Sequence, residues 1–284
     1  MKLRDLVVVL DGSPRSDVIL GVALDLARRR DAHVTGLCPL ELLYPIHVAL
    51  ALGGFPLAVQ EVANRLEAEA LEKARAIEAN FREQLRRNDA RGNWQVATGL
   101  AADDVARRAR TADLLVLGQT DPDHPPPPAA RHLIEDALIT AERPLLLVPF
   151  AGQFDTIGTN VLIGWNGTRE AARAAHDALL LIEPTATVTL LTVEHHRSAA
   201  KSGAVPGADM AEHLARHGLK VSAARTVTDG SISDSDALLA HASDSGADLL
   251  VVGGYGHSRA RELILGGVSR ELLDHMTLPT LVSH

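Results

Sequence analysis

Two heptapeptides decide the fold of this chain: Ala112-Asp-Leu-Leu-Val-Leu-Gly118 and Ala247-Asp-Leu-Leu-Val-Val-Gly253. They begin 135 residues apart. The same offset separates Pro144, which precedes Leu-Leu-Leu-Val, from Pro279, which precedes Thr-Leu-Val. Matches that recur at a fixed offset indicate an internal repeat, in which one structural unit occurs twice.

The starts of the two copies also match, residues 7–12 against 162–167, but with an offset of 155. The first copy therefore holds about 20 extra residues between its first strand and its Ala-Asp-Leu-Leu strand. We expect two homologous domains, residues 1–150 and 158–284, joined by a short polar stretch at 151–158.

Uninterrupted runs of Leu and Val, as in both heptapeptides, are typical of strands buried on both faces of a parallel sheet. Each copy alternates such runs with amphipathic helical patterns. In the first copy we predict strands at 6–10, 32–37, 94–98, 114–117 and 145–148, and helices at 16–30, 60–87, 101–111 and 129–140. In the second copy we predict strands at 161–164, 187–193, 221–226, 249–252 and 280–282, and helices at 169–181, 208–217, 233–245 and 269–275. The fold class is α/β, with two doubly wound domains, each a five-stranded parallel sheet with helices on both faces. Any ligand is expected at the carboxyl ends of the strands.

Composition excludes several classes of protein. The 284 residues are 46% hydrophobic and carry a net charge of −8, which gives no electrostatic reason to expect a nucleic-acid partner. A single Cys38 excludes an internal disulfide framework and a Cys-based zinc site. The apolar runs at 6–10 and 46–58 are too short to cross a bilayer, and the N-terminal pattern is not that of a signal peptide. We therefore expect a cytoplasmic protein with no membrane partner.

The second copy carries glycines where a phosphate could bind. Its fourth strand is followed by Gly253, two residues, Gly256, nine residues, and then Gly266-Gly267-Val-Ser269. Glycines after a strand let backbone N–H groups converge on an anion, and a helix start leaves further N–H groups unpaired. Ser269 is placed to cap that helix or to donate a hydroxyl to a phosphate. The alternative is a tight turn followed by a helix cap.

This arrangement resembles the universal stress protein family in its tandem two-domain form, which has the adenine nucleotide alpha hydrolase-like fold. Its nucleotide-binding members have Gly-x2-Gly-x9-Gly-[Ser/Thr] after the fourth strand, and Gly267 stands here at the Ser/Thr position. At the end of the first strand, where the family usually has Asp, the second copy has Asn166. Main-chain groups that face adenine in the family correspond to Val193. The resemblance implies ATP, with or without Mg²⁺, in the second domain, and it allows His257 either to touch phosphates or to be a solvated loop residue.

The first copy has the opposite pattern. It keeps Asp11 at the end of its first strand, but the three glycine positions hold Gly118, Asp121 and Arg131. The loop between them contains five prolines, four of them consecutive. Proline lacks an N–H donor, so we expect this loop not to bind a phosphate and the first domain to be structural.

Other polar residues are given structural interpretations. The pair His195-His196 follows a strand, but neighbouring side chains on an extended segment point apart, so a metal site is not predicted. Asp234 and Asp236 are interpreted as first-turn helix acids rather than as a Mg²⁺ site. The Arg28-Arg-Arg30 and Arg107-Arg108 runs are interpreted as solvated helix ends, and Cys38 as a small buried side chain. The segment 39–60 is interpreted as a packed loop, a lid, a ligand pocket or a contact surface.

No catalytic residue is predicted, because the sequence has no Walker-type loop and no nucleophile elbow. The leading hypothesis is a stress-response protein that binds ATP in its second domain. A slow ATPase or transferase at the same site and a nucleotide-free scaffold or adaptor are the alternatives. The resemblance also implies that the strands at 145–148 and 280–282 pair antiparallel. The protein partner, and whether two tandem chains associate, are left open.

Overall fold

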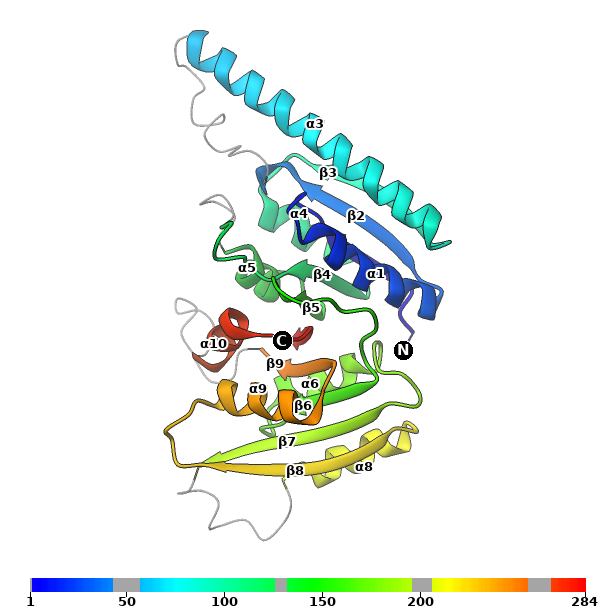
Figure 1. Ribbon diagram of the computed structural model, residues 1–284, viewed down its shortest axis with the longest axis vertical. Helices are drawn as coiled ribbons and strands as arrows, with labels where there is room; N and C mark the ends of the chain where they lie inside the picture. The colour runs from blue at the N-terminus through cyan, green and yellow to red at the C-terminus, as the bar shows by residue number, and fades with distance from the viewer. Residues whose placement is uncertain (1, 43–56, 126–131, 196–205, 255–266) are drawn as a thin grey trace. The chain divides into compact units, whose positions relative to one another are not determined.

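The computed structural model describes residues 2–42, 57–125, 132–195, 206–254 and 267–284. The chain divides into two compact units, Lys2–Arg143 and Pro144–His284 (Figure 1). Within the described ranges, no helix is both long and apolar enough to cross a lipid bilayer.

The first unit contains four parallel strands in the order β3-β2-β1-β4, with helices on both faces (Figure 1). Residues of β1 and β4 such as Val8 and Leu114 are completely buried, as expected for strands covered on both faces. The elements are β1 Asp5–Val9, α1 Ser16–Arg30, β2 His33–Pro39, η1 Leu40–Leu42, α3 Leu57–Arg87, β3 Arg91–Ala97, α4 Ala101–Ala109, β4 Leu114–Gly118 and α5 Leu133–Thr140.

The second unit contains six strands in the order β5-β10-β9-β6-β7-β8. All neighbouring pairs are parallel except β5 with β10, which pair antiparallel, so the pairing implied by the resemblance is confirmed. This pairing places β5 in the compact unit Pro144–His284. The elements are β5 Leu145–Val148, β6 Asn160–Gly164, α6 Arg169–Ala178, β7 Thr187–His195, α8 Ala208–Arg216, β8 Lys220–Thr228, α9 Asp234–Ser245, β9 Leu249–Gly253, α10 Gly267–His275 and β10 Thr280–Ser283. The predicted α/β fold class is confirmed: each copy supplies five strands, and β5 of the first copy belongs to the compact unit of the second.

Local chemistry sets where the helices begin and end. Helix α1 ends at Arg30 because Asp31 adopts the left-handed conformation (φ 52°) and donates its N–H to the carbonyl of Ala27. Helix α9 begins after Ser233, whose hydroxyl accepts the N–H of Asp236, so the predicted first-turn position of that acid is correct.

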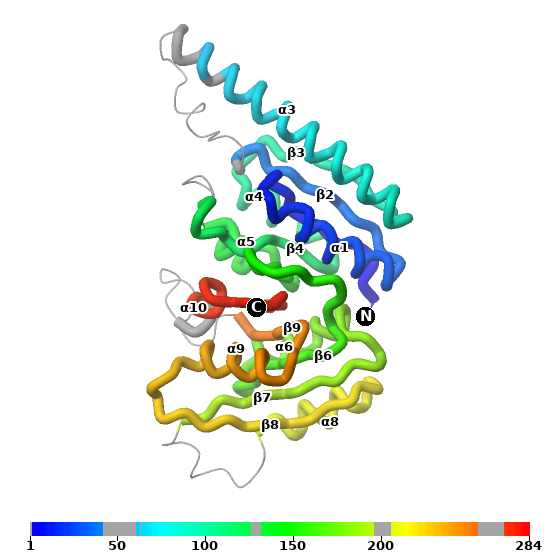
Figure 2. The backbone as a smooth tube through the Cα atoms, in the orientation of Figure 1, coloured from blue at the N-terminus to red at the C-terminus, as the bar shows by residue number. Residues whose placement is uncertain are grey.

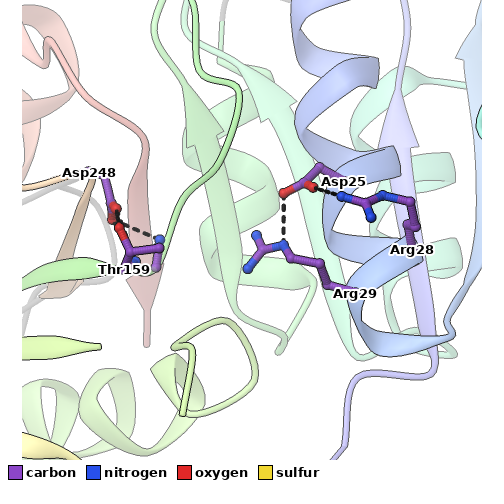
Figure 3. Close-up of polar contacts among 6 residues, drawn as sticks. Asp25, Arg28, Arg29, Thr159 and Asp248 are labelled. Carbon is purple, nitrogen blue, oxygen red and sulfur yellow. Dashed lines mark hydrogen bonds and ion pairs between the residues drawn. The ribbon is translucent and has the colours of Figure 1, made fainter. Parts of the chain in front are cut away.

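The aspartate in each repeated heptapeptide holds the start of the first strand of its own copy. The Asp113 carboxylate accepts the backbone N–H groups of Arg4 (2.8 Å) and Asp5 (3.1 Å). The Asp248 carboxylate accepts those of Gly158, Thr159 and Asn160, at 2.7 to 3.1 Å, and the hydroxyl of Thr159 (Figure 3). The aspartate therefore recurs in the heptapeptides because it joins two neighbouring strands at the edge where both begin.

Three histidines lie against one another where α6 and α8 meet. The ring of His213 is 4.9 Å, centre to centre, from those of both His176 and His217, with edge-to-face geometry. Its Nε2 is buried and has no hydrogen-bond partner among the described residues. Burial, followed by the charges that His176, His217 and Arg216 carry when protonated, lowers the pKa of His213 below its ordinary value.

This lowered pKa predicts an acid-sensitive second unit. As the pH falls below about 6.5, the unfolded chain binds a proton at His213 before the folded chain does, so the folded state loses stability until the pH passes the folded pKa. Urea unfolding at pH 7.5 and 5.5 should show a larger loss of stability for the wild type than for His213→Gln. An equal loss in both proteins would contradict this assignment.

Candidate functional site

The three predicted site residues on strands or strand ends lie at one edge of the second unit. Strands β9, β6 and β7 are neighbours, all parallel, and their register brings their carboxyl ends to nearly the same level. Gly253 ends β9, Asn166 follows β6, and Val193 lies near the end of β7. Strand β7 follows β6 in the chain and lies on one side of β6, whereas β9 lies on the other side, so the strand order reverses at β6. Open α/β sheets bind ligands outside the carboxyl ends of the strands at such a point.

Asn166 shapes the turn between β6 and α6. Its Oδ1 accepts the backbone N–H of Thr168 (3.2 Å) and the Thr168 hydroxyl (2.7 Å). Thr168 in turn caps α6 by accepting the N–H of Ala171. Gly167, between them, has φ 74°, a conformation that other residues rarely adopt. Because Oδ1 is used by the turn, the group that exposed Asn166 can offer to a ligand is its Nδ2 amide, a donor.

The first unit builds the same turn with Asp11. Its Oδ1 accepts the N–H of Ser13 (2.9 Å) and the hydroxyl of Ser16 (3.0 Å), and Gly12 has φ 73°. The two copies therefore differ at this position in one outward atom. Asp11 presents a second carboxylate oxygen, which is an acceptor, whereas Asn166 presents an amide donor.

Gly253 lies against the start of α6 without room for a side chain. A Cβ atom there would stand 2.5 Å from the backbone nitrogen of Ala171 and 2.6 Å from the carbonyl carbon of Glu170. The next residue, Gly254, donates its N–H to the carbonyl of Ser283 (2.7 Å). The Ser283 hydroxyl, which the sequence analysis did not identify, is buried at this edge and has no hydrogen-bond partner among the described residues.

A second group missed from the sequence is Glu170, in the first turn of α6. Its side chain is buried beside Gly253. Burial acts to raise its pKa, but hydrogen bonds from Arg169, its own backbone N–H and Thr168 outweigh burial, so the pKa lies below its ordinary value. The adjacent Arg169-Glu170 pair gave no sequence signal for a site, because it resembles any solvated helix start.

The remaining predicted loop residues are only partly described. Gly256, His257 and Gly266 lie outside the described residues. Helix α10 begins at Gly267, so Ser269 is in its first turn. The helix thus starts two residues before the predicted position, with Gly267 inside it and Ser269 within its first turn rather than at its N-cap.

His195 has partners that its sequence neighbourhood does not reveal. Its Nδ1 lies 3.0 Å from the hydroxyl of Thr228, and its Nε2 lies 3.5 Å from Oδ1 of Asp234. His196 lies outside the described residues. In the part of the chain that the structure describes, no group of three His, Cys, Asp or Glu side chains is placed to hold a metal ion.

The equivalent edge of the first unit carries carboxylates engaged with the protein itself. Glu41 is buried and accepts the N–H of Ala101 at the start of α4 (2.5 Å). Asp121 accepts the N–H of Asp123 (2.9 Å) and contacts Nδ1 of His124 (3.0 Å). These hydrogen bonds lower the pKa of Asp121, so its negative charge is favoured. Arg131 lies outside the described residues.

The model of the universal stress protein family matches residues 159–284. No match to a curated protein sequence was found. Among solved structures, a universal stress protein from Archaeoglobus fulgidus DSM 4304 is similar with a TM-score of 0.74, at 14% identity, over 99% of this chain and 96% of that chain. A protein of unknown function from Pseudomonas aeruginosa PAO1 is similar with a TM-score of 0.63, at 14% identity, over 99% of this chain and 92% of that chain.

The family model covers the part of the chain that contains the carboxyl ends of β9, β6 and β7 and the glycine-rich sequence. The similarity of fold extends over both units. Residues 159–284 therefore belong to the universal stress protein family, and the chain as a whole has a fold similar to that of the Archaeoglobus fulgidus universal stress protein.

Proposed function

We propose that the second unit binds an adenine nucleotide, ATP with or without Mg²⁺, at the carboxyl edge of β9, β6 and β7, and that the first unit does not. The observation that carries this proposal is the convergence of Asn166, Val193 and Gly253 on the strand-order reversal. The Gly253–Ser269 sequence continues from that edge into the start of α10. In this arrangement backbone N–H groups hold the phosphates, and Asn166 donates to the nucleoside.

The contrast with the first unit supports a single nucleotide site. There Asp121 stands at the position that Gly256 has in the second copy, and its hydrogen bonds favour its negative charge. Negative charge opposes a triphosphate at short range. The proposed role is therefore that of a stress-response module in which one domain responds to nucleotide and the other supports it.

The test uses matched alanine variants of the two turns. ATP at 100 times its dissociation constant should raise the unfolding free energy of the wild type by about 2.7 kcal/mol. Asn166→Ala and Asp11→Ala both remove a turn acceptor, but only Asn166→Ala should reduce the stabilisation by ATP, measured by thermal unfolding and isothermal titration calorimetry. Absence of any shift at millimolar ATP would favour the nucleotide-free scaffold, and loss of the shift only in Asp11→Ala would reverse the assignment of the site.

A further inference from the structure

The first unit has a strongly basic edge, which lies opposite the edge formed by the carboxyl ends of its strands. In this unit the strands begin where α1, α3 and α4 end, and we call this the amino edge (Figures 1 and 2). Twelve cationic residues lie there: Lys2, Arg4, Arg28, Arg29, Arg30, Arg86, Arg87, Arg91, Arg107, Arg108, Arg110 and Arg143. Eight acidic residues lie among them or pair with them: Asp5, Asp25, Asp31, Glu83, Asp89, Asp104, Asp113 and Glu142. A chain with a net charge of −8 therefore concentrates positive charge at one edge.

Within the amino edge, single carboxylates are shared by pairs of arginines. Asp25 lies 3.0 Å from a guanidinium nitrogen of Arg28 and 2.8 Å from Nε of Arg29 (Figure 3). Arg28 is 63% exposed, so much of its guanidinium group faces solvent.

The other two shared carboxylates repeat this arrangement. Glu83 pairs with Arg86 (2.8 Å) and Arg87 (2.6 Å), and hydrogen bonds from these arginines lower its pKa to about 2. Asp31 pairs with two residues distant in sequence. They are Arg4 (3.3 Å) and Arg91 (2.5 Å). Three carboxylates therefore neutralise only half of the charge of six arginines.

The second unit is an internal control for the general preference of helix ends for cations. A helix C-terminus attracts positive side chains through its dipole, and this preference would act equally in both copies. At the corresponding edge of the second unit, however, α6, α9 and α10 end without Lys or Arg. The cations of that edge are Arg216 and Lys220, and Asp244, Asp248 and Asp274 lie with them. The basic edge is therefore a property of the first unit and not of the fold.

The chemistry of the amino edge favours carboxylates as the partner groups. Eleven of its twelve cations are arginines, whose planar guanidinium groups match carboxylate and phosphate oxygens. The three shared carboxylates are the anions that these arginine pairs already accommodate. The two aromatic side chains of this unit that the structure describes, Phe81 and Trp94, pack against each other with ring centres 5.4 Å apart. They therefore do not form the stacking surface that single-stranded nucleic acid requires.

We propose that the amino edge of the first unit is a docking surface for an acidic segment of another protein, whose Asp and Glu side chains pair with the exposed guanidinium groups. The net charge of −8 repels a long polyanion but opposes a short acidic segment much less. This places a protein partner on the first unit, at the edge opposite the one where Glu41 and Asp121 lie.

The experiment measures binding of a fluorescein-labelled peptide of about ten residues, mostly Glu and Asp, long enough to span several of these arginines. The triple variant R28Q/R87Q/R91Q leaves Arg29, Arg86 and Arg4 paired with Asp25, Glu83 and Asp31, so each carboxylate keeps one arginine partner. The control variant R65Q/R173Q/R216Q removes three arginines that are also exposed and ion-paired, but outside the amino edge. We expect the edge variant to weaken binding about tenfold and the control less than about twofold. Wild-type affinity should fall as salt is added.

Two further arms separate the classes of partner. The same titration is made with inorganic polyphosphate and with single-stranded DNA. Binding of the acidic peptide that the edge variant selectively weakens supports the proposal. Absence of peptide binding at low salt, tight binding of polyphosphate or DNA without the peptide, or equal loss in the two triple variants would each overturn it.

Discussion

Replacing Asp248 by alanine should lower the free energy of unfolding of the second unit by about 3 kcal/mol, because hydrogen bonds to a carboxylate contribute about 1.5–3 kcal/mol and several are lost together. The variant leaves three consecutive backbone N–H groups, from Gly158 to Asn160, without their acceptor. It also removes the partner of the Thr159 hydroxyl. Water can reach this edge and replaces part of the loss, so the expected cost is smaller than the sum of the individual bonds.

The chain provides its own reporter for this measurement. It has two tryptophans, Trp94 in the first unit and Trp165 in the second. In a Trp94→Phe background, fluorescence during urea unfolding reports on the second unit through Trp165 alone. Asp248→Asn keeps the shape of the side chain and one acceptor oxygen, so its free energy of unfolding should lie between those of the wild type and Asp248→Ala.

The homologous position gives a graded comparison. Asp113 accepts two backbone N–H groups rather than three, so Asp113→Ala should destabilise the first unit by a smaller amount, about 2 kcal/mol, reported by Trp94 in a Trp165→Phe background. An Asp248→Ala protein that unfolds at the same urea concentration as the wild type would show that the repeated aspartate does not hold the strands together.

The internal repeat made most of the fold predictable. Buried Leu and Val runs identify the strands, and the helix at 16–30 is predicted with the bounds that α1 has. The repeat also placed Asn166 and Gly253 at neighbouring strand ends, because the carboxyl ends of parallel strands share one edge. The reason for the repeated aspartate was not predictable, because the groups it binds are backbone N–H groups, which leave no mark on the sequence.

Contacts between distant side chains were the part that sequence reasoning missed. Asp234 lies beside His195 because β7 and α9 bring them together, although 39 positions separate them. The basic amino edge was hidden for a related reason. Short arginine runs at separate helix ends look like solvated termini one by one, as at Arg28-Arg-Arg30, and only the parallel topology gathers them at one edge.

Replacing Gly253 by alanine should destabilise the second unit by about 3 kcal/mol, at the upper end of the usual cost of overpacking. The added methyl group would meet the backbone of Glu170 and Ala171, at 2.6 and 2.5 Å, and a backbone cannot rotate away as a side chain can. The start of α6 must therefore shift, or the end of β9 must bend. Either movement disturbs the turn that Asn166 forms with Thr168.

Gly118, at the equivalent position of the first unit, provides a matched control for the destabilisation that alanine causes at Gly253. A methyl group there would meet Cδ1 of Ile19 at 2.6 Å, the far end of a flexible side chain, so Gly118→Ala should cost less than about 1 kcal/mol. Urea unfolding followed by Trp165 for Gly253→Ala and by Trp94 for Gly118→Ala measures both. If the proposed nucleotide site is correct, Gly253→Ala should also lose stabilisation by ATP under conditions in which it remains folded, whereas Gly118→Ala keeps it. Equal destabilisation by the two alanines would mean that α6 yields as readily as Ile19, and Gly253 would then have no special packing role.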